Sequence, residues 1–103
     1  MWLSRNPTHN FIPQTTLNAS SIPISTGGMV EFTSNTALQS ALLKQIAADT
    51  VQINNGVTVN VTGNAVDVYT NNANYTGSGG NASTTGTFTG SGATTNPLSS
   101  APF

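Results

Sequence analysis

The chain has 103 residues and only 5% of them are charged, whereas ordinary soluble domains contain about 25% charged residues. Its net charge of −1 and its two basic residues exclude a nucleic-acid partner held through phosphates, because that binding requires several Lys or Arg to release counterions. There is no Cys, and the single His9 has no partners for a ligand set or a triad. We therefore expect no enzyme activity, no catalytic residues, no cofactor and no metal site.

Uncharged polar residues take the place of the missing charges. The chain contains 17 Thr, 13 Asn, 11 Ser and 10 Gly. Thr and Asn supply hydrogen bonds without the desolvation cost of burying a charge, so such a chain can be packed between neighbouring proteins. A neutral polar surface and a disordered polar tract are equally compatible with this composition.

The sequence contains no membrane or secretion signal. No stretch of about 18 apolar residues exists, so we expect no membrane-spanning segment. The start MWLSRNPTHN lacks a basic region followed by an apolar run, which is unlike a secretory signal peptide. Because Met1 precedes the bulky Trp2, we expect an untrimmed chain made in a cytoplasm.

Residues 1–32 are expected to form an extended N-terminal arm. Pro7, Pro13 and Pro23 break any helix and push the preceding residues toward extended conformations. Apolar side chains are scattered along the arm without a period, which suits docking into a partner or addition of a strand to its sheet edge. A tail folded back over its own core is the alternative. Met29–Phe32 is a candidate short strand.

Residues 33–69 are predicted to form the compact core, which begins with a helix at about 36–49. Residues 37–48 contain no Gly or Pro and many good helix formers. Thr36 and Gln39 fit a capping box. Leu38, Leu42 and Ile46 recur at the spacing of one helix stripe.

The apolar period changes to 2 after the predicted helix. Valines alternate with polar residues over 57–61 and again over 65–69, with turn-forming residues at Asn54-Asn55-Gly56 and Thr62-Gly63-Asn64. This pattern predicts a small antiparallel β-meander at about 51–69, with its valines facing the helix. The expected fold class is therefore α+β, one short helix packed on the meander and flanked by long extended arms.

The predicted core is too small to be comfortably stable. Roughly 35 residues without disulfide or metal bury little apolar surface, so additional stability is expected from other chains. Residues 70–103 are Thr/Gly/Asn/Ser-rich and form the predicted extended C-terminal arm. The apolar residues of the two arms predict a partner interface, namely Trp2, Phe11, Ile12, Phe88, Leu98 and Phe103.

Two further motifs in the sequence do not predict a function. The glycines of residues 77–80 lack the strand, the helix and the Lys of a phosphate-binding loop. Thr87-Phe88-Thr89 superficially resembles the threonine ladders of ice-binding solenoids. Those ladders require a fixed repeat over several turns, and no such repeat is found in the sequence.

Small, cysteine-free, charge-poor, Thr/Asn/Gly-rich chains with an extended arm and a compact β-core resemble structural proteins of tailed bacteriophage virions. The resemblance implies a capsid cement, decoration or minor head protein that binds the major capsid protein or other virion proteins, in many copies or as a homo-oligomer. The implied location is the virion. Two alternatives stay open: a trimeric tail or fibre adaptor in which residues 70–95 intertwine, and a bacterial surface filament subunit joined by strand donation.

Overall fold

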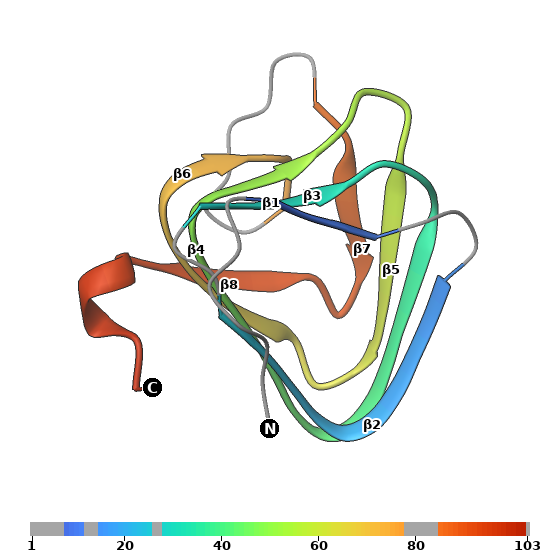
Figure 1. Ribbon diagram of the computed structural model, residues 1–103. Helices are drawn as coiled ribbons and strands as arrows, with labels where there is room; N and C mark the ends of the chain where they lie inside the picture. The colour runs from blue at the N-terminus through green and yellow to red at the C-terminus, as the bar shows by residue number, and fades with distance from the viewer. Residues whose placement is uncertain (1–7, 12–14, 26–27, 78–84, 103) are drawn as a thin grey trace.

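The computed structural model describes residues 8–11, 15–25, 28–77 and 85–102, and within them the chain is almost entirely β-strand (Figure 1). The elements, in chain order, are β1 (Thr8–Phe11), β2 (Thr15–Ser25), β3 (Met29–Phe32), β4 (Thr36–Ile53), β5 (Thr58–Gly63), β6 (Val66–Asn74), β7 (Thr87–Gly90), β8 (Ala93–Asn96) and the short 3-10 helix η1 (Leu98–Ser100).

Every strand pair among these residues is parallel, and each turn of chain lies on the turn before it. Thr8 pairs with Met29, Met29 with Thr50, and Thr50 with Asn72. Successive partners are thus 21, 21 and 22 residues apart. A chain that stacks at a nearly constant offset is a solenoid, and Figure 1 looks down its roughly triangular coil. The protein is a small parallel β-solenoid.

The long strand β4 bends twice and contributes to all three faces of the coil. Face 1 holds the starts of β2 and β4, with β5 and β7. Face 2 holds the end of β2, the middle of β4, the start of β6 and β8. Face 3 holds β1, β3, the end of β4 and the end of β6.

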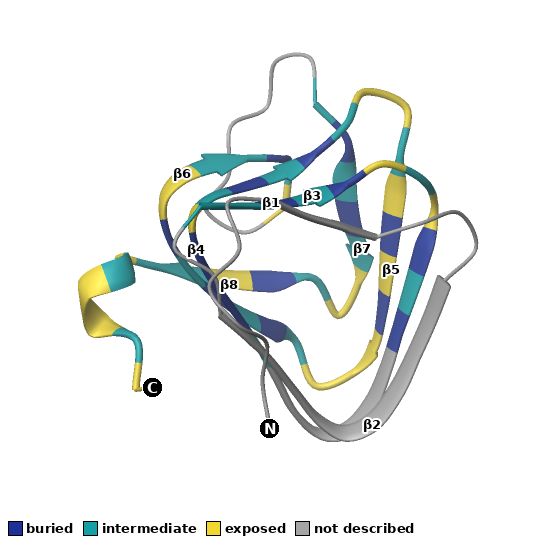
Figure 2. Ribbon diagram, viewed as in Figure 1, coloured by how far each residue is buried: buried dark blue, intermediate teal, exposed yellow. Residues whose placement is uncertain are grey.

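The core is the interior of the coil, and it is filled by one side-chain column after another. Val30, Val51 and Ala73 are successive partners on face 3; the first two are fully buried, and Ala73 packs against the core. Figure 2 shows buried positions on the strands and exposed positions at several of the corners. The buried apolar cluster is Val30, Phe32, Leu38, Ile46, Ala48, Val51, Ile53, Val59, Val61, Val66, Val68, Tyr75, Phe88 and Ala93.

The helix predicted at 36–49 is wrong, because this segment is part of β4. Leu38 and Ile46 are buried, and their separation of eight residues fits a strand face as well as a helix stripe. β4 pairs with β2 and β3 along one edge and with β5 and β6 along the other. Pairing on both edges outweighs the helix propensity of its Ala and Leu residues.

The antiparallel meander is also wrong, although each of its three predicted strands, near 51–53, 57–61 and 65–69, overlaps an observed strand, the first being the end of β4. The strands predicted at 57–61 and 65–69 are confirmed as β5 and β6, with Val59, Val61, Val66 and Val68 buried. They pair with β4 in parallel rather than with each other. The predicted turns contain glycines at positive φ, Gly56 at 82° and Gly63 at 80°, but these turns round corners of the coil.

The prediction that long extended arms flank the core is corrected as well. The described parts of residues 8–32 form β1, β2 and β3, and those of residues 85–96 form β7 and β8. All five strands belong to the same sheet as β4, β5 and β6. The repeat is not visible in the sequence, because successive turns of the coil have no sequence motif in common. Only the stacked positions correspond, as Val30, Val51 and Ala73 do.

The last turn of the coil is longer than the others. Thr36 pairs with Val59, an offset of 23 residues, whereas Thr58 pairs with Thr87, an offset of 29. Thr76 and Gly86 close the additional segment, because the Thr76 amide donates to the Gly86 carbonyl at 2.9 Å.

Candidate functional site

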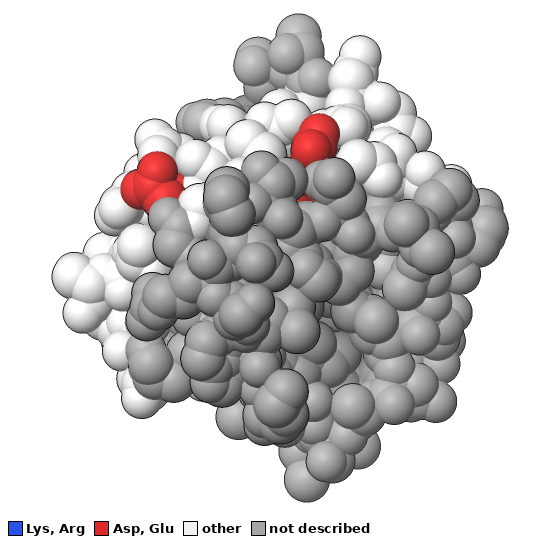
Figure 3. Space-filling model, in the orientation of Figure 1, with Lys and Arg blue, Asp and Glu red and all other residues white. Residues whose placement is uncertain are grey.

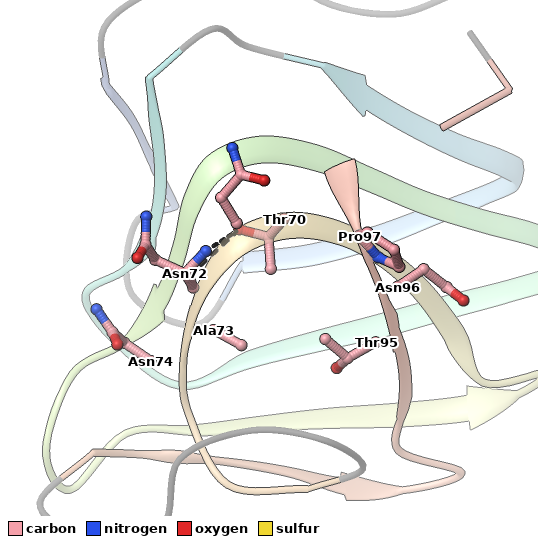
Figure 4. Close-up of a pocket in the computed structure, with 8 residues that line it drawn as sticks. Thr70, Asn72, Ala73, Asn74, Thr95, Asn96 and Pro97 are labelled. Atoms are coloured by element: carbon pink, nitrogen blue, oxygen red, sulfur yellow. Dashed lines mark hydrogen bonds between the residues drawn. The ribbon is translucent and has the colours of Figure 1, made fainter. Parts of the chain in front are cut away.

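A groove opens at the end of the coil, between the end of β6 and the end of β8. Its volume is about 390 Å³, and Figure 4 shows side chains from both strands around it. The lining residues are Thr70, Asn71, Asn72, Ala73, Asn74, Thr95, Asn96 and Pro97. None of them is charged, so the groove offers only neutral hydrogen-bonding groups.

The groove lies where the ladder of face 3 stops. Residues 72–74 of β6 pair with β4 along one edge, and β8 pairs with β6 only over Val66–Tyr69. Beyond Asn96 the chain passes through Pro97 into η1, which Figure 1 shows outside the coil. No described strand pairs with the outer edge of residues 71–73, which we call the open edge.

Asp49 organises the residues at the start of the open edge. The Thr70 hydroxyl donates to the Asp49 carbonyl at 2.9 Å, and the Asn71 amide nitrogen donates to the Asp49 carboxylate at 2.9 Å. The Asn72 amide nitrogen donates to the Asp49 carbonyl at 3.3 Å and to the Thr50 hydroxyl at 3.5 Å. The side chains of Asn71 and Asn72 thus direct their N–H groups toward other residues of the protein.

Asn96, on the opposite side of the groove, also directs its side-chain N–H groups toward the protein. Its amide nitrogen lies 3.4 Å from the carbonyls of both Val68 and Thr94. Within the described part of the chain, the side-chain oxygens of Asn71, Asn72 and Asn96 are left to accept hydrogen bonds from a ligand or solvent. The groove is accordingly rich in acceptors and suits a ligand rich in N–H or O–H donors.

A buried tyrosine supports the groove from inside the coil. The Tyr75 hydroxyl hydrogen-bonds the Thr95 hydroxyl at 2.5 Å, and Tyr75 has 0% exposed surface. Burial raises the pKa of Tyr75 above its usual value, and the hydrogen bond to Thr95 partly offsets this effect. The ring of Tyr75 meets that of Phe88 edge to face, with centroids 4.9 Å apart.

The residues predicted to form a partner interface are not brought together by the described structure. Phe88 is 5% exposed and lies in the core, with its ring centroid 6.1 Å from that of Phe32. Leu98 lies on η1 and is partly exposed. Phe11 belongs to β1, but its side chain lies outside the description. Trp2, Ile12 and Phe103 lie outside the described residues.

Charge is sparse on the described surface. Among the described residues on the face viewed, Figure 3 shows two acidic groups and otherwise uncharged atoms. In the described ranges, no three His, Cys, Asp or Glu residues gather as metal ligands would. A search of the same ranges found no helix with the length and apolar character needed to cross a membrane.

Sequence reasoning missed the groove. The sequence pattern assigned residues 71–74 to the low-complexity extended arm. An Asn-rich segment directly after a strand of alternating apolar and polar residues could have indicated the groove. Such a segment can continue the strand and expose its side-chain amide groups. Comparisons with protein-family models, curated proteins and solved structures found no match.

Proposed function

We propose that this protein is a virion structural protein, a cement, decoration or minor head protein that binds neighbouring capsid subunits in many copies and stabilises the shell. The open edge at residues 71–73 is the observation that carries this proposal. Unpaired strand edges bind extended segments of other chains by completing the ladder. Many such weak contacts on a repeating lattice add up to firm attachment.

The chemistry of the groove and the surface supports a protein partner over a charged ligand. Asn71, Asn72 and Asn96 offer acceptors, which match the N–H groups of a polypeptide backbone. The chain has only two basic and three acidic residues, and the two acidic groups visible in Figure 3 lie apart from each other. An uncharged contact of this kind is desolvated at low cost.

A fibre or surface filament subunit is the second candidate, and the solenoid geometry favours it. The open edge faces along the coil axis, since it is the next position of the face 3 ladder. Contacts along the axis build a linear object when the partner is another copy of this chain, and they attach a single copy when the partner is a capsid subunit. The described parts of residues 70–95 belong to the coil of their own chain, which argues against a trimer of intertwined strands.

Copy number in purified particles tests the proposal and separates the two candidates. Virus particles released by the source organism are purified, and this protein is quantified against the major shell protein by mass spectrometry. Hundreds of copies per particle are expected for a shell protein, and a dozen or fewer for a tail or fibre part. Absence from every purified particle would overturn the virion proposal.

A further inference from the structure

The corner between β4 and β5 holds the one Asn-Gly pair of the chain, Asn55-Gly56. Both residues are exposed, and Figure 2 shows this corner at the surface of the coil. The Val57 amide donates to the Asn54 carbonyl at 3.0 Å, so Asn55 and Gly56 are the two central residues of a β-turn. The φ of Gly56 is +82°, and a Cβ there would have nothing within 4 Å.

The side chain of Asn55 and the backbone amide of Gly56 are both accessible to water. Within the residues that the structure describes, neither group has a hydrogen-bond partner. The two ends of the turn are held, by contrast. The Asn54 amide donates to the Phe32 carbonyl at 3.1 Å, and the Val57 carbonyl accepts from the first amide of β7 at 3.1 Å. The turn is therefore anchored at both ends while its centre is free to react.

We infer that Asn55-Gly56 is a site of spontaneous deamidation in the folded protein. The deprotonated Gly56 nitrogen attacks Cγ of Asn55. The bond between these two atoms forms, the Cγ–Nδ2 bond breaks, and ammonia leaves with the proton that the Gly56 amide has lost. Water then opens the resulting succinimide ring at either of its two carbonyls, which gives aspartate or isoaspartate. The net reaction consumes water and releases ammonia, so it needs no enzyme and no oxidant.

The glycine at position 56 makes this asparagine different from others on the surface. Glycine has no Cβ to shield its nitrogen from the attacking geometry. Asn60 is the natural comparison, because it is also exposed but lies within β5. Its side-chain oxygen accepts from the Thr89 hydroxyl at 3.2 Å, and the residue that follows it, Val61, is β-branched and buried. Asn60 should therefore react far more slowly than Asn55.

The two products change the corner of the coil and leave its core intact. Aspartate adds a carboxylate to a chain that has only three acidic residues. Isoaspartate adds a methylene to the main chain of the turn. The open space around Gly56 lets the turn bulge outward, although its two ends are anchored. We expect both products to keep the solenoid.

Timed incubation of the full chain at mildly alkaline pH, followed by digestion and mass spectrometry of the peptides, measures the conversion. Asn55 is expected to convert at least about tenfold faster than Asn60, because of the two only Asn55 precedes a residue without a Cβ. The rate should rise with pH, since the deprotonated nitrogen is the nucleophile. An isoaspartyl methyltransferase should label the product. Asn55→Gln is the matched control and should not convert, because its longer side chain would have to close a larger ring.

Incubation of the same protein in urea shows whether the folded turn itself reacts. A reaction that required global unfolding would be slower in the native protein by a factor on the order of 10³ or more, which is the equilibrium constant of a stable fold. The native rate is instead expected to stay within about tenfold of the rate in urea, because this turn reaches water without any opening of the coil.

Two outcomes would overturn the inference. A native rate about a thousandfold or more below the rate in urea would show that the folded turn protects Asn55. Equal native rates at Asn55 and Asn60 would show that the exposed turn and its glycine confer no selectivity. The reaction involves no partner, so the proposed function is judged separately by the particle analysis.

Discussion

The hydroxyls of Tyr75 and Thr95 share a hydrogen bond of 2.5 Å that joins the end of β6 to β8. Tyr75 follows directly after β6, and Thr95 lies within β8. The bond therefore links the two walls of the groove from within. We expect Tyr75→Phe to lower the free energy of unfolding by about 0.5–1.5 kcal/mol, the net value of one such bond.

Urea unfolding of Tyr75→Phe, Thr95→Val and the double variant measures this link. If the two hydroxyls act on each other, the double variant loses less stability than the sum of the single variants. Strict additivity would show that the bond contributes nothing to the fold.

The raised pKa of Tyr75 predicts that alkali destabilises the protein. In the unfolded chain the phenol titrates near the ordinary value of 10.0, whereas in the folded chain it holds its proton to higher pH. The unfolded state then binds fewer protons, so stability is fully present below about pH 10 and falls as pH rises toward the folded pKa. Unfolding free energies measured from pH 8 to 11 should show this decline, and Tyr75→Phe should flatten it. An equal decline in the variant would assign the effect to other groups.

Gly86 is required for steric reasons. A Cβ there would lie 2.3 Å from both the Ile53 Cγ2 and the Val57 carbonyl oxygen. We expect Gly86→Ala to cost about 3 kcal/mol or more, at the upper end for overpacking. Gly92→Ala is the control, because Gly92 has a φ of +71° with nothing within 4 Å and should cost about 1–2 kcal/mol. Thermal unfolding ranks the two variants, and equal losses would contradict the close contact at Gly86.

Phe88 and Leu98 were both predicted to contact a partner, but the structure places Phe88 in the core and Leu98 on the surface helix η1. Phe88 is 5% exposed and contacts two aromatic rings, so Phe88→Ala should destabilise the isolated chain by about 3–5 kcal/mol. Leu98→Ala on η1, where no residue is buried, should change stability by less than about 0.5 kcal/mol. Chemical denaturation of both variants decides this, and a neutral Phe88→Ala would remove Phe88 from the core.

Local patterns in the sequence predicted the features that depend on nearby residues, namely strand positions and inward-facing side chains. Val59, Val61, Val66 and Val68 alternate with polar residues, so β5 and β6 and their inward faces were predictable. Strand direction was not, because a turn at Gly56 looks the same whether it closes a hairpin or rounds a corner. The parallel order depends on contacts more than 20 residues apart, such as Val30 with Val51.

The segment of β4 shows why the helix prediction failed. Its Ala and Leu residues favour a helix locally, and a four-residue spacing satisfies both periods. Only the strands on either side of β4 decide between the two, and these come from distant parts of the chain. The groove was hidden for the same reason: Asn72 and Asn96 approach each other only after the coil has closed.

The parallel coil itself is tested most directly by nuclear Overhauser effects in the isotope-labelled protein. Val51 lies between Val30 and Ala73 on adjacent strands, about 4.8 Å from each backbone. A parallel solenoid gives cross-strand effects from Val51 to both residues and none of the i to i+3 pattern that a helix over 37–48 would give. A helical pattern there, with no effect between Val30 and Val51, would contradict the solenoid.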